Sequence, residues 1–318
     1  MRKIAVVLFN LGGPDSLEAV EPFLFNLFCD PDIFNLPFGQ KLFAKIISSR
    51  RAPKIVGEYK LIGGKSPINE WTEKQRSMLE KNLRKDYPSL DVHIAMRYWK
   101  LLTDETVAKV EKANYEKIIL LPLYPHYSIT TTGSSFNEWK RHYKGEASKL
   151  VFINDYYADE KYVAAINQRI DETILQFPEK IRREVQIVFS AHGTPVSLVK
   201  KGDPYSNHIK ETVNAVMNAR KHSHEHHLCF QSKVGPMKWL EPTTASMIEE
   251  LAQENKKNLL IVPISFVSDH VETLYELDIE YRHVADKCGI ENYIVMKGLN
   301  DSELFIESLT EIVKREME

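Results

Sequence analysis

Short apolar runs alternate along the chain with longer polar stretches that have helical periodicity. Runs rich in Val, Ile, Leu and Phe predict β-strands at residues 4–9, 92–98, 117–123, 149–155, 185–191, 227–232, 258–264 and 292–297. Helices are predicted between them at residues 70–85, 104–113, 160–176, 206–221, 243–254 and 302–316. Several runs, such as Ile118–Leu121, are apolar at every position, which is typical of parallel strands covered on both faces. The alternation therefore predicts an α/β fold.

The eight predicted strands divide into four and four. We expect two similar α/β lobes, each with a four-stranded parallel sheet flanked by helices, and an active-site cleft between them. The first lobe spans residues 1–156 and contains a long insertion at residues 11–91. The second spans residues 157–318, and its final helix at 302–316 is free to pack back on the first lobe. Because the insertion is much longer than one crossover helix needs, it indicates a functional segment.

Chemically versatile side chains follow several of the predicted strands. Ligands of parallel sheets bind outside the carboxyl ends of the strands, so these positions are the first place to look for chemistry. His192 leaves one strand before a Gly-Thr-Pro turn, and Asp269, His270 and Glu272 follow another. A neutral imidazole there is able to take a proton or to hold a divalent metal. A histidine that merely precedes a helix cap explains the same sequence around His192.

Three carboxylates recur at four-residue intervals after the seventh predicted strand. Glu272, Glu276 and Glu280 share one face of a helix, where like charges are unfavourable unless a cation or solvent relieves them. Together with Asp269 and His270, they form a polar track able to carry a metal ion or protons. The alternative is a solvated acidic face with a capping box made by Asp269 and Glu272, which spacing alone favours.

The insertion has the most unusual composition in the chain. Six of the 14 phenylalanines fall between Phe23 and Phe43, and the cations Arg50, Arg51 and Lys54 follow directly. An exposed apolar surface backed by fixed cations suits a large flat ligand that bears carboxylates, or a membrane face with anionic lipids. The alternative is a pair of helices with a small core of its own.

Composition and charge exclude several classes of protein. The 318 residues are 43% hydrophobic and 27% charged, which excludes a disordered chain, and the net charge of −2 gives no basic field for nucleic acid. Cys29, Cys229 and Cys288 lie far apart, so we expect neither a disulfide framework nor a thiolate zinc site. No apolar stretch approaches the ~18 residues that span a bilayer, so we expect a soluble protein, at most one that sits on a membrane surface.

The histidine tract at residues 222–227 looks like a metal-binding tract. It precedes the sixth predicted strand, at the amino edge of the sheet and away from the expected site. Solvated loop histidines are the default interpretation, with adventitious metal capture as the alternative.

Eight motifs follow one another in order between Asn10 and about Tyr281. They are Asn10–Pro14, Leu61–Ile68, Arg97–Tyr98, Tyr124–Ser128, Thr131–Ser135, Ser190–Pro195, Gln231–Met237 and Ser268–Asp278. In this series the chain resembles the ferrochelatases, which insert ferrous iron into a porphyrin. A series of this length is far more specific than a single short motif.

The resemblance implies that His192 and Glu272 are the catalytic residues, that both touch the metal, and that they face each other across the porphyrin. Which of the two accepts the pyrrole protons stays open. The resemblance also implies that Asp269, His270 and Glu276 line the route of the metal or of the protons.

The resemblance further implies a set of side chains around the macrocycle. These are Leu11, Tyr59, Ser66, Arg97, Tyr98, Trp239 and Phe266, with Arg51 near a propionate. Residues 23–47 resemble the apolar lip of the family, where porphyrin enters and the membrane is touched.

The substrates implied are protoporphyrin IX and ferrous iron, which give protohaem in the last step of haem synthesis. Leu11 stands where members that act on coproporphyrin tend to carry a tyrosine, and this favours protoporphyrin. No cofactor and no iron–sulfur cluster are expected, because Cys288 is the last cysteine before the chain closes at Glu318. The alternatives are a chelatase for coproporphyrin or another metal, and a non-catalytic porphyrin or haem carrier. We expect a cytoplasmic protein that contacts the inner membrane peripherally through residues 23–47.

Overall fold

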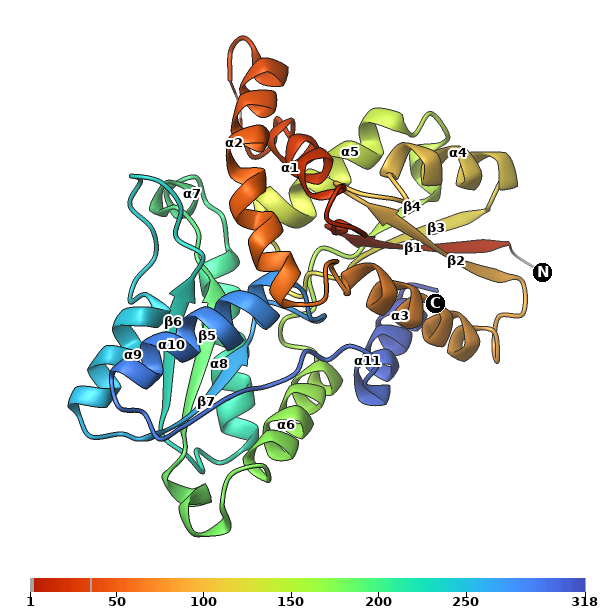
Figure 1. Cartoon of the computed structure of the whole chain (residues 1–318). Coiled ribbons are helices and arrows are strands. Elements are labelled where there is room, and N and C mark those ends of the chain that lie inside the picture. The colour runs from red at the N-terminus through yellow and green to blue at the C-terminus, as the bar shows by residue number, and fades with distance from the viewer. Residues whose placement is uncertain (1–2, 35, 318) are drawn as a thin grey trace. The chain divides into compact units, whose positions relative to one another are not determined.

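The chain forms two compact units. The computed structural model describes residues 3–34 and 36–317 (Figure 1). Unit 1 comprises Met1–Tyr156 together with Phe305–Glu318, and unit 2 comprises Tyr157–Leu304. The C-terminal helix of the sequence is thus grouped with the N-terminal sheet.

Unit 1 is built on a four-stranded parallel sheet in the order β2-β1-β3-β4. Its strands are β1 (Ile4–Asn10), β2 (Leu90–Met96), β3 (Lys117–Pro122) and β4 (Leu150–Phe152). In the register, Ile4 lies opposite Leu90 on one side and opposite Lys117 on the other. Every residue of β1 is buried, as expected for a central strand covered on both faces.

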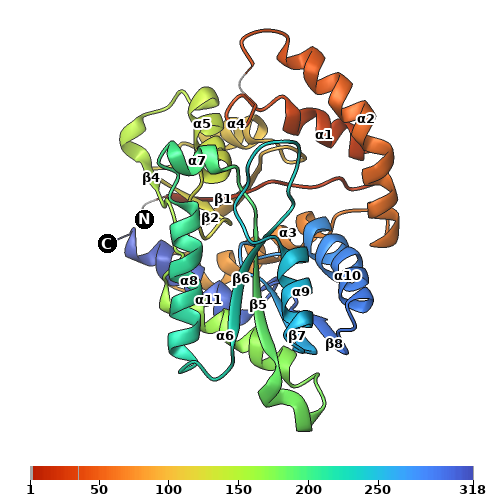
Figure 2. The ribbon, with the colours of Figure 1, turned by 90° about the vertical axis from the view of Figure 1, so that its left-hand side faces the viewer.

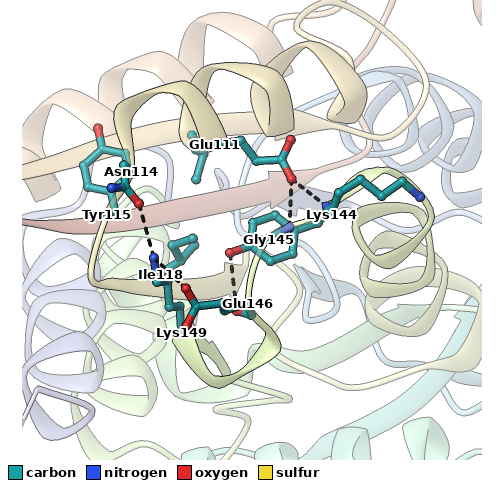
Figure 3. A pocket seen from close by; sticks show the side chains of 10 residues that line it. Glu111, Asn114, Tyr115, Ile118, Lys144, Gly145, Glu146 and Lys149 are labelled. Atoms are coloured by element: carbon teal, nitrogen blue, oxygen red, sulfur yellow. Dashed lines mark hydrogen bonds and ion pairs between the residues drawn. The ribbon is translucent and has the colours of Figure 1, made fainter.

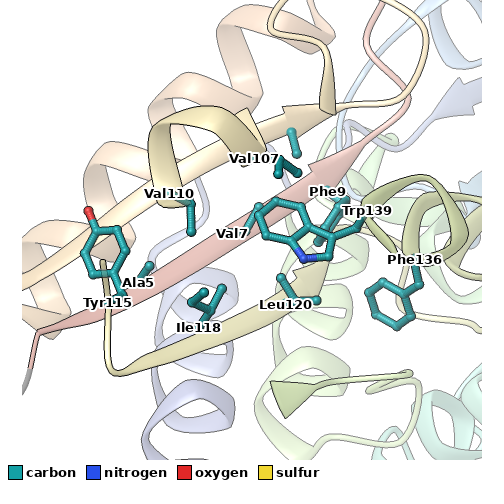
Figure 4. Packing of buried hydrophobic residues seen from close by; sticks show 11 residues of the cluster. Ala5, Val7, Phe9, Val107, Val110, Tyr115, Ile118, Leu120, Phe136 and Trp139 are labelled. Carbon is teal, nitrogen blue, oxygen red and sulfur yellow. The ribbon is translucent and has the colours of Figure 1, made fainter. Parts of the chain in front are cut away.

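Helices cover both faces of this sheet. The helices of unit 1 are α1 (Val20–Phe28), α2 (Gln40–Leu61), α3 (Ile68–Leu83), α4 (Thr103–Ala113), α5 (Ser134–His142) and α11 (Glu303–Arg315), with short helical turns η1 (Ile129–Gly133) and η2 (Ala147–Lys149). Figure 1 shows α4 and α5 on one face of the sheet and α3 and α11 on the other. In the core, Ala5, Val7 and Phe9 of β1 pack against Val107 of α4 and Trp139 of α5 (Figure 4). These β1 residues alternate along the strand, so they share one of its faces.

Unit 2 repeats the same topology, with the strand order β6-β5-β7-β8. Its strands are β5 (Gln186–His192), β6 (His226–Gln231), β7 (Asn258–Pro263) and β8 (Asn292–Val295). Its helices are α6 (Glu160–Ile174), η3 (Glu179–Glu184), α7 (Val196–Lys200), α8 (Tyr205–Ala219), α9 (Thr244–Gln253), the π-helical segment η4 (Glu272–Glu280) and α10 (Tyr281–Lys287). Figure 2 shows α6 and α8 on one face of this sheet and α9 and α10 on the other.

The predicted fold class is confirmed, because the structure contains two four-stranded parallel sheets flanked by helices. All eight predicted strands are present, although β4 is limited to Leu150–Phe152 within the predicted run 149–155. The prediction of one α-helix after the seventh strand is wrong, since Glu272–Glu280 is π-helical before α10 begins. None of the helices in the described part of the chain is both long and apolar enough to cross a bilayer.

Candidate functional site

The site in unit 2 lies where the sheet topology branches. The chain leaves β5 to form β6 on one side of it, whereas β7 pairs with β5 on the other side. Ligand sites of open α/β sheets occur at such a switch point, outside the carboxyl ends of the two strands. His192 is the last residue of β5, and the segment that follows β7 carries Phe266, His270 and Glu272. The predicted catalytic residues therefore come from the two strands that flank the switch point.

Glu272 contacts two histidines with its two carboxylate oxygens. Its Oε1 lies 3.5 Å from Nε2 of His192, and its Oε2 lies 3.2 Å from Nε2 of His270. The side chains of His192 and Glu272 are 35% and 29% exposed, so solvent reaches both. The arrangement is an imidazole–carboxylate–imidazole row that is open to solvent at one end.

The orientation of His192 is set by its neighbours. Its Nδ1 lies 2.7 Å from the carbonyl oxygen of Gly193. Because a carbonyl only accepts hydrogen bonds, Nδ1 carries a proton and Nε2 is the atom that faces Glu272. The backbone N–H of His192 donates to Oγ of Ser265 at 2.9 Å, and the hydroxyl of Tyr205 donates to the carbonyl oxygen of His192 at 3.0 Å. One hydrogen bond therefore orients the ring, and two others hold the backbone that carries it.

His192 and Glu272 shift each other's pKa so that both groups are charged. Burial by itself lowers the pKa of His192, but the nearby Glu272 carboxylate outweighs burial and raises that pKa to about 9. Burial likewise acts to raise the pKa of Glu272, but the imidazoles of His192 and His270 hold it well below its usual range. The resting site is thus an imidazolium–carboxylate pair at neutral pH.

Two aromatic residues from the predicted set lie at or next to this row. The ring of Phe266 is near both histidines, with its centroid 6.2 Å from that of His192 and 4.4 Å from that of His270. Trp239 donates its indole N–H to the carbonyl oxygen of Val234 at 2.9 Å. A Cβ on Gly193 would lie 3.3 Å from the Trp239 ring and 2.7 Å from a backbone oxygen, so only glycine fits this turn.

Glu276 lies one turn further along the π-helical segment and is held by four donors. Its carboxylate accepts from the backbone N–H of Ser232 at 2.7 Å and from the Ser232 hydroxyl. It also accepts from Nε2 of Gln231 and from the Tyr281 hydroxyl, each at 3.1 Å. Burial, and then the charge of Glu272, raise the pKa of Glu276 above its ordinary value. Glu276 is therefore a fixed carboxylate that accepts a proton more readily than an ordinary glutamate.

The expectation that His192 and Glu272 face each other across the macrocycle is wrong. A flat ring between two groups needs van der Waals contact on each face, or about 7 Å in total. The two side chains lie 3.5 Å apart, which leaves no room for a ring between them.

Arg97 and Tyr98, which the sequence assigned to the macrocycle, converge on a carboxylate in unit 1. The guanidinium of Arg97 lies 2.9 Å from Oδ1 of Asp30, and the hydroxyl of Tyr98 donates to Oδ2 of Asp30 at 2.7 Å. Ser134 donates to the same oxygen, and Nε of Arg97 donates to Oγ of Ser134 at 2.8 Å. The side chain of Asp30 has no exposed surface. The sequence analysis missed Asp30, whose partners lie far away along the chain.

The other predicted substrate residues of unit 1 occupy two places. Leu11 follows β1, and its carbonyl oxygen accepts the N–H of Tyr98 at 2.9 Å. Ser66 is buried near it, and its N–H donates to the carbonyl oxygen of Pro14 at 2.8 Å. Arg51 and Tyr59 lie on α2, where the guanidinium of Arg51 is 5.9 Å from the centroid of the Phe28 ring.

A separate cavity of 460 Å³ in unit 1 is unrelated to these residues (Figure 3). It lies between the end of α4 and the segment before β4, at the edge where β3 begins. The Glu111 carboxylate accepts from the backbone N–H groups of Lys144 and Gly145, and Nζ of Lys149 donates to Asn114 at 3.2 Å. Its polar groups thus satisfy one another, and it carries no catalytic arrangement.

The histidine tract lies at the amino end of β6, on the opposite edge of the unit 2 sheet from His192. His222, His224 and His227 each form a hydrogen bond, respectively to Asn218, to the carbonyl oxygen of Arg182, and to Gln186. Within residues 3–34 and 36–317, no group of three or more acidic, histidine or cysteine side chains is arranged to hold a metal ion. At the exits of β5 and β7 the structure therefore shows an imidazole–carboxylate contact, His192 with Glu272, rather than a closed set of metal ligands.

Comparisons with known proteins agree over nearly the whole chain. A family model described as Ferrochelatase matches residues 3–317. The ferrochelatase of Geotalea uraniireducens is 48% identical over 318 residues, covering 98% of each chain. That of Citrifermentans bemidjiense is 47% identical over 316 residues, covering 98% of each chain, and that of Aquifex aeolicus is 45% identical over 318 residues, covering 99% of this chain and 100% of its own.

Solved structures of much lower sequence identity share the fold. SirB from Bacillus subtilis with Fe3+ is 12% identical, with a TM-score of 0.55, and covers 99% of this chain and 95% of that one. The sirohydrochlorin chelatase SirB from Bacillus subtilis subspecies spizizenii in complex with cobalt has the same TM-score at 10% identity. With the family match and these relatives, the chain belongs to the ferrochelatase family and is an enzyme that inserts a metal ion into a porphyrin for haem synthesis.

Proposed function

We propose that the reaction is the insertion of ferrous iron into protoporphyrin IX, which yields protohaem and releases two protons. The observation that carries this proposal is the contact between His192 and Glu272 at the switch point of the unit 2 sheet. Imidazole and carboxylate together suit ferrous iron, and a set of only two protein ligands suits a metal that must be handed on. A closed set of four ligands would retain it.

Proton transfer follows from the same pair. A metal ligand must be deprotonated, so Fe2+ that binds at His192 displaces to solvent the proton that this imidazole shares with Glu272. When the metal moves to the porphyrin nitrogens, His192 and Glu272 become free to accept the two pyrrole protons. Nε2 of His270, 3.2 Å from Glu272, accepts the proton of that carboxyl group and holds it as an imidazolium, and we assign Glu276 as a further acceptor. Phe266 lies beside His192, and Trp239 lies beside the next residue, Gly193, and we assign both aromatic rings to contact with the macrocycle.

The decisive experiment follows the loss of porphyrin fluorescence with Fe2+ under anaerobic, reducing conditions. His192→Ala and Glu272→Ala are each expected to lower turnover by about 10²–10⁴-fold, because each removes a proton acceptor. His142→Ala is the matched control, since His142 pairs with Glu138 at 3.1 Å on the surface of unit 1. Wild-type turnover in both site variants would contradict the assignment. Stoichiometric porphyrin binding without any turnover of the wild type would establish a carrier instead.

The identity of the porphyrin and of the metal needs its own assay. We infer a preference for protoporphyrin IX from Leu11, which follows β1. Equal concentrations of protoporphyrin and coproporphyrin, offered together with Fe2+, are expected to give mainly protohaem. A reversed preference would reassign the chain to coproporphyrin. Zn2+ and Co2+ are offered in parallel, because affinity for imidazole alone does not select iron.

We also propose peripheral contact with the cytoplasmic face of the inner membrane through residues 23–47. Phe38 is 91% exposed and Leu42 is 65% exposed, and Lys41 and Lys45 beside them are exposed as well. Large apolar side chains among lysines suit the boundary between acyl chains and anionic headgroups.

We propose that the enzyme works without an iron–sulfur cluster or another cofactor. The sequence holds three cysteines, whereas a cluster commonly takes four thiolates. Cys229 is buried in β6, and Cys288 lies at the end of α10 in the same unit. The test is analysis of iron and acid-labile sulfide in protein purified anaerobically, with both expected at background level.

A further inference from the structure

Asn300 binds the side chain and the backbone of Asp269 at the same time. Its Nδ2 donates to Oδ2 of Asp269 at 2.7 Å, and its Oδ1 accepts the backbone N–H of Asp269 at 2.9 Å. The backbone N–H of Asn300 donates to the carbonyl oxygen of Val267 at 2.8 Å. One residue therefore fastens the segment after β8 to the segment that leads from β7 into the site.

The backbone around Asn300 is shaped for this contact. Asn300 has a φ of +46°, a left-handed conformation that asparagine tolerates better than most residues. Gly298 donates its N–H to Oδ1 of Asp269 at 3.0 Å. A Cβ on Gly298 would lie 2.9 Å from the backbone nitrogen of Asp269 and 3.1 Å from the carbonyl carbon of Ser268. The two segments therefore lie in direct backbone contact, which a larger residue at position 298 would push apart.

Asp269 in turn connects to His270 and to the start of the π-helical segment. The hydroxyl of Thr273 donates to Oδ1 of Asp269 at 3.1 Å and accepts the backbone N–H of His270 at the same distance. Nδ1 of His270 lies 3.0 Å from the carbonyl oxygen of Ser268. With its backbone and Nδ1 held in this way, His270 points Nε2 toward Glu272.

Burial makes the contact costly to break. Asn300, Asp269 and Thr273 are 4%, 8% and 1% exposed, so water does not readily replace a lost partner. The carboxylate of Asp269 is satisfied by three neutral donors, from Asn300, Gly298 and Thr273. A buried ionised acceptor that loses its donor incurs the full desolvation cost of that group, so the segment moves rather than leave Asp269 unsatisfied.

We propose that Asn300 is a positioning residue for metal insertion, which acts through Asp269 to set the place of His270 and Glu272. This inference rests on the function proposed above for those two residues. It also assigns Asp269 to anchoring rather than to the route of metal or protons, because both of its carboxylate oxygens are taken by structural donors.

The first test compares Asn300→Ala with Asn292→Ala. Asn292 donates to Oδ1 of Asn258 at 2.8 Å at the opposite end of the same sheet, so its variant loses an amide hydrogen bond of the same kind away from the site. The readouts are the imidazole NMR signals of His270 in the metal-free protein, assigned with His270→Asn, together with porphyrin binding and kcat for zinc insertion. Asn300→Ala is expected to move the His270 signals and to lower kcat at least tenfold, with porphyrin Kd unchanged within about twofold. Asn292→Ala is expected to change none of these.

The second test exchanges the two partners. Asn300→Asp alone places two carboxylates where 2.7 Å now separates an amide from a carboxylate. This variant is expected to lower kcat further than Asn300→Ala does. The double variant Asp269→Asn with Asn300→Asp restores one carboxylate and one amide, and is expected to return the His270 signals and most of kcat. If Asn300→Ala does not fold, the exchange variant by itself tests the positioning role of Asn300.

The outcomes separate the two proposals. Unchanged His270 signals in folded Asn300→Ala, or no recovery of them in a folded exchange variant, would overturn the positioning role. Displaced His270 signals with unchanged insertion would support the contact but overturn the function assigned to His270 and Glu272.

Discussion

Oε1 of Glu272 lies 3.5 Å from Nε2 of His192, although the two side chains reach each other from the exits of different strands. The contact raises the pKa of the imidazole to about 9 against the effect of burial, and it holds the pKa of the carboxylate well below its usual range. Each group therefore keeps the other charged. The same linkage makes the stability of the metal-free protein depend on pH.

The charge pair is expected to stabilise the fold most between pH 4.5 and 6.5, the ordinary pKa values of the two groups. Because the pKa of His192 is raised on folding, its contribution is complete below pH 6.5 and is lost as the pH rises through about 9. The lowered pKa of Glu272 works in the opposite direction, and its contribution is lost as the pH falls below 4.5. Urea unfolding is expected to show Glu272→Gln destabilised at pH 6 and much less so at pH 10.

Asp86→Asn is the control for this pH dependence, because Asp86 forms a surface ion pair with Lys314 in which the side chains are 54% and 37% exposed. Its effect on the free energy of unfolding is expected to be small and similar at both pH values. If Glu272→Gln lowers the free energy of unfolding equally at pH 6 and at pH 10, the result would contradict the ion pair between His192 and Glu272.

Gly13 is predicted to be intolerant of any side chain. A Cβ at this position would lie 2.5 Å from the Cβ and the Oγ of Ser66 and 2.9 Å from Cγ2 of Ile68. Gly13→Ala is therefore expected to lower the free energy of unfolding by about 1–3 kcal/mol, as overpacking does. Gly57 lies within α2 with nothing within 4 Å of its added Cβ, so Gly57→Ala is expected to be neutral or to stabilise by up to about 1 kcal/mol. Equal effects of both substitutions in urea unfolding would refute this account.

The sequence predicts the sheets because strands have a local signature, a run of apolar residues. It also directs attention to His192 at the end of one such run and to the polar segment with Glu272 that follows another, whereas their assignment as a catalytic pair comes from the family resemblance. The four-residue spacing of Glu272 and Glu276 suits an α-helix as well as other helices, so it did not reveal the π-helical geometry. The direct contact of His192 with Glu272 depends on tertiary structure, which no local pattern shows, and the expectation that they face each other across the ring rested on the resemblance alone.

Two residues that hold predicted site residues in place were missed for a physical reason. Asp30 and Asn300 bind partners that lie far away in the sequence, and such hydrogen bonds leave no period behind. Asp30 drew no attention because it follows an apolar run as an ordinary polar residue. A local hint existed only for Asn300, since asparagine favours the left-handed conformation found there.

Two phenylalanines of residues 23–47 in unit 1 are predicted to respond differently to substitution by serine. Phe34 packs against Phe28 and Phe43, with ring centroids 5.2 and 6.1 Å away, whereas Phe38 is 91% exposed. Phe38→Ser is expected to leave the melting temperature unchanged and to weaken binding to anionic vesicles about tenfold, because the side chain no longer enters the acyl region.

Phe34→Ser serves as the contrasting variant, and it is expected to destabilise unit 1 by about 1–2 kcal/mol through lost ring packing. Co-sedimentation with vesicles of anionic and of neutral lipid, beside thermal unfolding, measures both effects. Unchanged vesicle binding by Phe38→Ser would contradict the proposed membrane contact through residues 23–47.

Breaking the ion pair of Asp30 with Arg97 is predicted to lower the free energy of unfolding more than breaking an exposed ion pair of unit 1. The two charges lie 2.9 Å apart, with side-chain exposures of 0% and 8%. Asp30→Asn leaves the guanidinium buried without its counter-charge, which costs about 3–5 kcal/mol in comparable cases. Glu73→Gln is the control, because Glu73 pairs with Arg76 at 2.7 Å but is 58% exposed, and its effect is expected to stay within about 1 kcal/mol.

Adding Arg97→Met to Asp30→Asn is expected to recover part of the lost free energy of unfolding in urea, since the unpaired buried charge is then gone. A double variant no more stable than Asp30→Asn would show instead that the hydrogen bonds from Tyr98 and Ser134 carry the stability.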